Sequence, residues 1–469
     1  MEKGAVVYPY IPNSVPEIKA EMLKEVGARD VMDLYEEIPD ELLFKGKLNL
    51  PEPIKDEFSI KKHVEGILAK NKNCSEYINF LGAGCARHFV PAVCDEMLGR
   101  GELLTCYGAE SWADHGKHQI FFEYQSMMAE LLDMDFLTVP LYDGGQAVAT
   151  SLCMANRLTG RKKVLLPASM NPEHLMLTQN YCSGIKESRS LELVLVNMNP
   201  LTGLMDMNDL RRKISPEVAA VLIENPTYLG VIEAQAEEIG SIAREAGAEF
   251  IVYTDPITLG VMEAPANYGA TLTIGDIHTL GLHLAGGGMQ GGFIACFDDM
   301  KYMNEFKEMV TGLTETTLEG EYGYAQVLIE RTHYAEREKG KEFTGTGTNL
   351  WMVAVAVYLA QMGPRGMKEV GTTIMQNAQY AAQQLNKIPG VKLQFSTPFF
   401  KEFVVNFDLT GKSTAEINAK LLENKIFGGL DLSRDFPEIG QSALFCVTEV
   451  NFKEEIDQLE CALRKIVSC

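Results

Sequence analysis

The sequence predicts an α/β protein with a large domain built on a mostly parallel sheet and a smaller C-terminal α+β domain. In the middle of the chain, six short apolar segments alternate with amphipathic helical ones, which is typical of a parallel sheet with helices on both faces. After about residue 340 the pattern changes to two helical segments, followed by strands mixed with helices. We therefore expect an N-terminal helical arm over residues 1–75, the large domain over 76–340 and the small domain over 341–469.

Composition and charge narrow the class of protein. The 469 residues are 46% hydrophobic and 23% charged, an ordinary balance for a soluble globular protein. The net charge of −22 argues against a nucleic-acid partner, because binding phosphate backbones needs a basic surface. No apolar run reaches about 18 residues, so no membrane span is expected. Ten cysteines without a C-x-x-C pair, and no signal-peptide pattern at the N-terminus, predict buried thiols and a cytoplasmic location.

The arm begins with helical signals. Ser14 and Glu17 have the spacing of a capping box for a helix that Gly27 would end. Asp30 is expected to start a second helix, which stops at Pro39. Apolar residues fall on one face of the first helix, namely Val15, Ile18, Met22, Leu23 and Val26. We expect this apolar face to be buried, either against the rest of the chain or against another subunit.

The expected strands of the large domain are apolar or β-branched runs. They cover residues 163–167, 192–197, 219–224, 249–254, 271–275 and 292–297. In the small domain we expect helices over 349–363, 366–388, 414–425 and 453–467, and strands within 391–395, 402–409 and 443–449. Parallel sheets place ligands at the carboxyl ends of their strands, so functional residues are expected there.

A glycine pair opens the first helix of the alternating region. Gly144 and Gly145 follow an apolar run and precede a helix that begins near Gln146. Backbone amides at such a helix start can bind phosphate, and glycines let the phosphate approach closely. The same pair is also compatible with an ordinary turn. We predict that these three residues contact a cofactor.

Asp255 follows an expected buried strand. An acid in this place often holds the ring nitrogen of pyridoxal phosphate, although it also commonly caps a following helix. Enzymes of that kind need a lysine shortly downstream to form a Schiff base, yet no lysine occurs between Asp255 and Lys301. Asn225, at the end of the preceding strand, could face the same ligand. Thr348 and Asn349 lie in a polar loop before an apolar helix, where they could simply cap it.

Four histidines lie near the expected strand ends or loops. His278 and His283 flank the strand that follows Asp255, and either could contact a ligand. Their spacing, without a nearby carboxylate pair, does not predict a metal site. His88 and His115 lie in polar or glycine-rich loops, where a surface position is expected.

Several common catalytic signatures are absent from the sequence. No G-x-G-x-x-G segment follows a strand, and no P-loop, H-E-x-x-H or G-x-S-x-G motif occurs. These absences argue against the common dehydrogenase, ATPase, zinc-protease and α/β-hydrolase classes.

Motifs along the whole chain resemble the α (first) subunit of two-subunit glycine decarboxylase, the P-protein of the glycine cleavage system. They occur in the same order as in that family. The matching stretches are YIPNSVPEIKAEMLKEVGARDVMDLYEEIP, FLGAGCARHFVPAVCDEML, FFEYQSMMAELLDMDFLTVPLYDGGQA, ENPTYLGVIE, EREKG, VAVYLAQMGPRGMKEV and IFGGLDLSRDFPEIGQSALFCVTE.

The resemblance implies the fold of fold-type-I pyridoxal phosphate-dependent transferases, with the cofactor lysine on the β (second) subunit. When this region is aligned with the His-Lys-Thr segment of the β subunit, His278 takes the position of the histidine and Thr279 that of the lysine. A threonine hydroxyl cannot form a Schiff base. The resemblance therefore implies a heterotetramer whose partner subunit holds pyridoxal phosphate covalently. Glycine would be decarboxylated there, and its aminomethyl group would pass to the lipoyl arm of the carrier H-protein.

Three segments depart from the family pattern, at residues 107–119, 309–320 and 337–349. The first keeps Tyr107, has its glutamate displaced to Glu110 and carries His115 at a glutamine position. Substrate or subunit contacts are predicted at six positions, namely Tyr107, Glu110, His115, Asn225, Thr348 and Asn349. Two alternatives stay open: a subunit of another pyridoxal phosphate enzyme that acts on a different amino acid or amine, and a non-catalytic binding protein on a degenerate fold.

Overall fold

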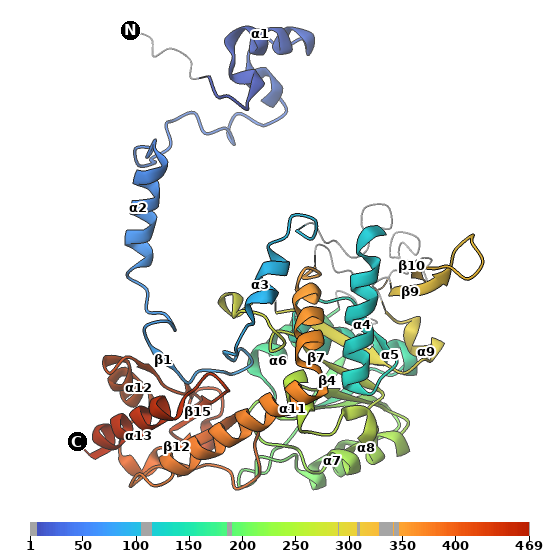
Figure 1. Cartoon of the computed structure of the whole chain (residues 1–469), viewed down its shortest axis with the longest axis vertical. Helices are drawn as coiled ribbons and strands as arrows, with labels where there is room; N and C mark the ends of the chain where they lie inside the picture. The colour runs from blue at the N-terminus through green and yellow to red at the C-terminus, as the bar shows by residue number, and fades with distance from the viewer. Residues whose placement is uncertain are drawn as a thin grey trace. The chain divides into compact units, whose positions relative to one another are not determined.

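The chain divides into two units, Met1–Asn71 and Lys72–Cys469, which we describe separately. This computed structural model describes residues 7–104, 115–184, 190–288, 290–306, 310–327, 341 and 347–468. The second unit is called the body below (Figure 1). It contains both the large and the small sheet, so the predicted division at residue 340 lies within it.

The first unit contains short helices, and their caps differ in part from the prediction. Helix α1 (Pro16–Glu25) has Val15 at its N-cap, without a side-chain cap. The predicted Ser14 cap is therefore wrong, because Ser14 lies in a preceding 3₁₀ turn and its hydroxyl donates to the Ile11 carbonyl (2.6 Å). Asp30 was predicted to start the second helix. It caps a 3₁₀ helix (Val31–Tyr35) by accepting from the Met32 amide at 2.9 Å.

Apolar side chains of the first unit lack a core. Across residues 7–71 no side chain is buried. Helix α2 (Glu57–Leu68) leaves Phe58 76% and Ile67 52% exposed, and Met22 of α1 is 49% exposed. Isolated helices of this length are marginal in water and normally depend on packing of their apolar face. The unit therefore presents an apolar surface that this chain does not fill within the unit.

The body is built on a seven-stranded sheet with the strand order β2-β8-β7-β6-β5-β3-β4. Strands β4, β3, β5, β6 and β7 are parallel, whereas β8 is antiparallel to β7 and β2 to β8. The bounds are β2 (Phe136–Leu137), β3 (Lys163–Pro167), β4 (Glu192–Val196), β5 (Val218–Glu224), β6 (Glu249–Tyr253), β7 (Leu272–Asp276) and β8 (Gly292–Cys296). All six predicted strands are present, and the short β2 is an addition.

Strands β3, β5, β6, β7 and β8 are buried on both faces of the sheet, and successive side chains along each strand point to opposite faces. Leu165, Val221 and Phe250 join the core with helices α4 (His118–Leu132) and α8 (Ala236–Glu245). The alternate positions join a second core with helix α5 (Gly144–Thr159); they include Val164, Leu222 and Ile251. This alternation explains why the strands read as continuous apolar runs.

One long helical run connects the large sheet to the small one. The two helices predicted over 349–363 and 366–388 form a single run, α11 (Trp351–Leu385), which is kinked at Gly363 and Pro364. Gly363 has φ 57° and ψ −178°, and proline cannot continue the helical hydrogen bonds. The first part of α11 packs in the large core and the second part in the small one (Figure 1).

The small sheet has four strands in the order β11-β12-β15-β14, and every neighbouring pair is antiparallel. The bounds are β11 (Lys392–Leu393), β12 (Glu402–Asn406), β14 (Leu430–Asp431) and β15 (Ser442–Cys446). Helices α12 (Thr414–Glu423), α13 (Lys453–Ser468) and the end of α11 share its main core. None of the described helices is long and apolar enough to cross a membrane.

Two close approaches hold the small sheet against the carboxyl ends of the large one. The loop after β5 reaches β12, where Gly230 (φ 86°) lies so near that a Cβ atom would be 2.0 Å from the Glu402 carbonyl oxygen. Strand β1 (Ile78–Asn79) pairs with β13 (Ile426–Phe427) of the small domain. The segment that follows β1 is thereby drawn between the two sheets, where the candidate site lies.

Candidate functional site

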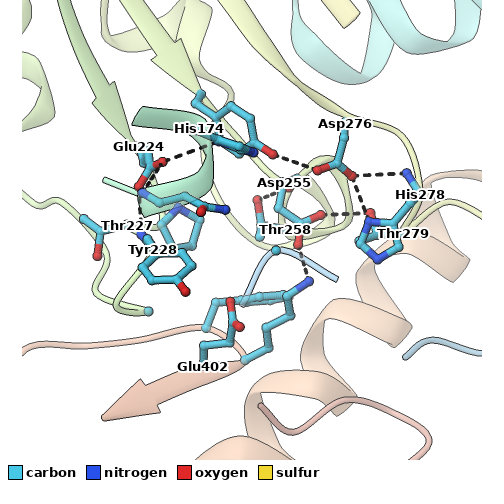
Figure 2. Close-up of a pocket in the computed structure, with 17 residues that line it drawn as sticks. His174, Glu224, Thr227, Tyr228, Asp255, Thr258, Asp276, His278, Thr279 and Glu402 are labelled. Atoms are coloured by element: carbon cyan, nitrogen blue, oxygen red, sulfur yellow. Dashed lines mark hydrogen bonds and ion pairs between the residues drawn. The ribbon is translucent and has the colours of Figure 1, made fainter. Parts of the chain in front are cut away.

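A cavity of about 70 Å³ lies where the parallel strands end and the small sheet begins (Figure 2). Its acidic walls come from Glu224 at the end of β5, Asp255 after β6 and Asp276 at the end of β7. Lys401 and Glu402 approach from the start of β12. This is the place where open α/β sheets bind their ligands.

Asp255 is held from two sides. Its Oδ1 accepts hydrogen bonds from Thr279 Oγ1 (2.8 Å) and from the Ile257 amide (3.2 Å), so it also caps the 3₁₀ turn Pro256–Gly260. Its Oδ2 accepts from Lys401 Nζ at 2.5 Å. Burial alone would raise the pKa of Asp255, but the Lys401 ammonium outweighs it and lowers this pKa to about 2. Asp255 is therefore an ionised, fully engaged carboxylate.

Lys401 is a buried ammonium, with 10% of its side chain exposed. Burial opposes its charge, yet the Asp255 carboxylate more than compensates and raises the pKa of Lys401. Its Nζ also lies 3.3 Å from His88 Nε2, while His88 Nδ1 lies 2.9 Å from Glu449 Oε2. Burial lowers the pKa of His88, which fits a neutral ring that accepts from Lys401 and donates to Glu449.

His88 corrects an expectation from the sequence. A surface position was expected, but the residue is only 8% exposed and contacts Lys401 and Glu449 of the small domain. The reason is the β1–β13 pairing, extended by Phe80, whose carbonyl accepts from the Cys446 amide at 2.9 Å. This pairing draws the glycine-rich loop inward, which the local sequence does not reveal.

His278 belongs to a second buried pair. Its Nδ1 lies 2.8 Å from Asp276 Oδ1, and its Nε2 lies 3.0 Å from the Ala86 carbonyl, so both ring nitrogens have acceptors. Burial works against the charged ring, but Asp276 prevails and raises the pKa of His278. Tyr253 donates to the other Asp276 oxygen at 2.7 Å. Figure 2 shows His278 and Asp276 adjacent to Asp255 and Thr279.

Two further carboxylates line the cavity with backbone partners. Glu224 accepts from the amides of Asn171 (3.3 Å) and Tyr228 (2.9 Å), and burial raises its pKa to about 7. Glu402 accepts from the Ala83 amide at 2.6 Å, and burial raises its pKa as well. Among the described residues that line the cavity, Lys401 is the only lysine or arginine. The cavity is therefore rich in carboxyl groups and contains one fixed cation.

The glycine pair opens helix α5 as predicted, but its first turn is already capped. Asp143 accepts from the Gln146 amide at 2.8 Å, and the Gln146 side chain accepts from the Tyr142 amide at 2.8 Å. Above Gly144, a Cβ atom would lie 2.6 Å from the Tyr253 hydroxyl. An adjoining cavity of about 210 Å³ includes Asp143, Gly144, Gly145, Glu173, His174 and Asp276, and no lysine or arginine among its described lining residues.

Pyridoxal phosphate requires three kinds of contact from a binding site. Its dianionic phosphate requires donors or cations, its ring nitrogen requires a free acid, and its aldehyde requires a lysine. Here the helix start is capped by a carboxylate, Asp255 is paired with Lys401, and position 279 is a threonine. The residues present do not fit the cofactor.

The cofactor contacts predicted for Gly144, Gly145, Gln146, Asp255 and His278 stay predictions. Asn225 does not line the cavity: its Oδ1 accepts from the Glu233 amide (3.0 Å) and its Nδ2 donates to Tyr268 (3.3 Å).

The remaining predicted positions lie away from the cavity or outside the described residues. Thr348 donates to the Leu141 carbonyl at 2.6 Å and Asn349 is buried, while the N-cap of α11 is Leu350. Tyr107 and Glu110 lie outside the described residues. His115 begins a 3₁₀ turn (His115–Lys117), but its side chain is not described. The subunit or substrate contacts predicted for these residues stay predictions.

Sequence reasoning missed the residue that contacts Asp255 most closely. Lys401 was part of an apolar run, "PFFKEFVVN", in which a single lysine–glutamate pair interrupts aromatic and branched residues. A charge inside such a run is the available signal for a buried ion pair. Its partner could not be read from the sequence, because Asp255 is 146 residues away.

No metal site emerges from the described residues. They contain no group of three or more His, Cys, Asp or Glu side chains placed to hold a metal ion. His283 is exposed and lies 2.9 Å from Asp95 Oδ1.

Nearly the whole chain matches known proteins of one family. The family model "Glycine cleavage system P-protein" matches residues 9–463. A probable glycine dehydrogenase (decarboxylating) subunit 1 of Staphylothermus marinus is 36% identical, covering 98% of both chains. The corresponding subunit 1 of Pyrococcus horikoshii is also 36% identical, covering 98% of this chain and 99% of that one.

Solved structures give the same result for the fold. The glycine decarboxylase (P-protein) of the glycine cleavage system, solved in inhibitor-bound form, has a TM-score of 0.85 at 30% identity, covering 98% of this chain and 100% of that chain. A sphingosine-1-phosphate lyase of Burkholderia pseudomallei has a TM-score of 0.64 at 15% identity, covering 92% and 94%, and shows the fold alone. The predicted fold-type-I pyridoxal phosphate-dependent transferase fold is confirmed, and the chain belongs to the glycine cleavage system P-protein family.

Proposed function

We propose that this chain is the non-lysine subunit of a glycine decarboxylase and works only together with a lysine-bearing second subunit. The observation that carries the proposal is Thr279. It stands where the resemblance places the cofactor lysine, and its hydroxyl is engaged with Asp255 at 2.8 Å. The relatives named "subunit 1" imply a second subunit of the same enzyme.

In this proposal the partner subunit holds pyridoxal phosphate covalently. The cofactor would supply an electron sink for the loss of carbon dioxide from glycine. The acidic helix start at Asp143 and the Asp255–Lys401 pair support a partner-held cofactor, since neither arrangement offers this chain a place for it. The aminomethyl group left after decarboxylation would pass to the lipoyl arm of H-protein, within a cytoplasmic complex.

The first unit is the proposed docking element for the second subunit in a heterotetramer. Its exposed apolar residues lie on both helices, and the described part of the unit buries none of them. Contiguous apolar surface of this kind marks protein–protein contacts in soluble proteins. On α2 the residues Ile60, Val64, Ile67 and Leu68 recur at helical spacing, as expected of an anchor face.

Reconstitution tests the proposed function. This chain and the lysine-bearing chain from the same organism are purified separately, mixed, and assayed for glycine decarboxylation with lipoylated H-protein. We expect activity only from the mixture, and borohydride-fixed cofactor only on the partner. Borohydride-fixed cofactor on this chain would contradict the proposal. A stable mixture that ignores glycine but decarboxylates another amino acid would instead favour the second interpretation of the sequence.

A further inference from the structure

Lys401 enters the pocket from the small domain and ends at the acid that follows β6. Its Nζ lies 2.5 Å from Asp255 Oδ2, and only 10% of its side chain is exposed. In enzymes with pyridoxal phosphate, an acid commonly pairs with the protonated ring nitrogen. A lysine ammonium presents the same kind of group to that acid, a cationic N–H donor.

We propose that Lys401 is the internal occupant of the ring-nitrogen position in this chain. Its ammonium takes the contact with Asp255 that a cofactor ring would otherwise make, and its stem fills the space in front of that acid. The pocket is thus closed to pyridoxal compounds by a side chain of the same protein. This inference concerns the isolated chain and does not depend on its activity in a complex.

The backbone around Lys401 fixes this arrangement. The Lys401 carbonyl accepts from the Val447 amide at 2.9 Å, directly beside the antiparallel pairing of β12 and β15. On the other side, Gly230 packs directly against the backbone of Glu402. The other contact of the ammonium is His88 Nε2 at 3.3 Å. Moving Lys401 out of the pocket would leave the Asp255 carboxylate buried and unpaired, which is strongly unfavourable.

Thr279 occupies the other side of the same carboxylate. Its Oγ1 donates to Oδ1 of Asp255, whereas Lys401 donates to Oδ2. Positions 279 and 401 therefore offer two alternative places for one ammonium beside one acid. Moving the lysine from 401 to 279 would keep the charge balance and would free the space that the Lys401 stem fills.

The test is a transposition of that lysine. The variants T279K, K401A and T279K/K401A are incubated with pyridoxal, reduced with borohydride and digested, and the label at position 279 is measured by mass spectrometry. Pyridoxal is the probe because it lacks the phosphate, so the acidic helix start does not influence the result. The double variant T279K/K392A is the matched control, since Lys392 is exposed on β11 of the same small sheet.

We expect T279K/K401A to carry about tenfold more label at position 279 than T279K or T279K/K392A, because only it has both a lysine and an open ring position. Labelling of the exposed lysines that all the variants share should be the same in every protein. Equal label at position 279 in T279K and T279K/K401A would overturn the proposal.

A second measurement starts from the unmodified chain and covers the case in which the double variant does not fold. The unmodified chain is titrated with pyridoxine 5′-phosphate, which has no aldehyde and cannot label surface lysines. We expect no binding heat and no change in thermal unfolding midpoint. Saturable binding to the unmodified chain, lost in the Asp255→Asn variant, would show that Asp255 is open to a ring and would overturn the proposal.

Discussion

The first unit and the pocket of the body differ in how their side chains are buried and paired. In residues 7–71 no side chain is buried, and helix α2 leaves Phe58 and Ile67 exposed. In the pocket, by contrast, Asp255 is paired with Lys401 and Asp276 with His278. The body thus pairs the buried charges of Asp255 and Asp276 with its own side chains, whereas the first unit exposes its apolar side chains.

The largest expected effect comes from breaking the pocket's internal pairing. K401A should lower the free energy of unfolding by about 3–5 kcal/mol, because it leaves the buried Asp255 carboxylate without its cation. Urea denaturation at neutral pH measures this change. K392A, on the exposed edge of the same sheet, is the control and should change stability by less than about 0.5 kcal/mol.

A double variant sharpens this prediction. If the cost of K401A comes from an unpaired carboxylate, then adding D255N should recover part of the lost stability, since no charge remains to be compensated. Additive losses from the two substitutions would show that Lys401 stabilises the body through packing and that the ion pair is not responsible.

The next effect concerns Glu224, one of two carboxyl groups in the pocket whose pKa is raised by burial. The pKa of Glu224 is raised from 4.5 to about 7. The folded chain therefore holds this proton more tightly than the unfolded chain, and this contribution to stability is lost as pH rises from about 4.5 to 7. At 1.36 kcal/mol per unit of pKa, the loss across this window is about 3 kcal/mol.

Glu224→Gln should flatten the stability profile between these pH values, as followed by denaturant unfolding at several pH values. The matched control is Glu245→Gln at the exposed end of α8, which should leave the profile unchanged. An E224Q profile as steep as that of the unmodified chain would assign the pH dependence to other groups.

The smallest effect on the stability of the chain itself is expected in the first unit. Phe58→Asp should change the free energy of unfolding of the isolated chain by less than about 0.5 kcal/mol, because Phe58 is 76% exposed. The same variant should weaken association with the second subunit by about 2 kcal/mol if Phe58 is an interface anchor. Analytical ultracentrifugation of the mixture measures the second quantity. If neither F58D nor Ile67→Asp weakened association with the second subunit, the contact with the partner would have to lie outside this face of α2.

Much of the fold could be predicted from local sequence patterns. Strand β5 was predicted over 219–224 and is Val218–Glu224, because a buried parallel strand is an uninterrupted apolar run. The helices around Gly363 were predicted as two segments, and the structure joins them through a kink. The cap at Ser14 was wrong because its hydroxyl had a nearer acceptor, the Ile11 carbonyl of the preceding turn.

The candidate site was less predictable than the strands that carry it. Asp255 was recognised because it follows an expected strand and no lysine occurs between it and Lys301, whereas Thr279 was recognised because the resemblance places it at the cofactor lysine. Lys401 and His88 were not recognised, although Lys401 completes the contact with Asp255. Nothing within a few residues of either one indicates which acid it meets.

The sequence by itself determined the order of strands and helices, the family, and the absence of a cofactor lysine at position 279. Each of these depends on side-chain periodicity or residue identity at nearby positions, which folding does not change. The tertiary structure alone decided that Lys401, 146 residues from Asp255, would neutralise that acid. An ion pair of this kind depends on how two sheets meet, and that geometry is set by the packing of the whole body.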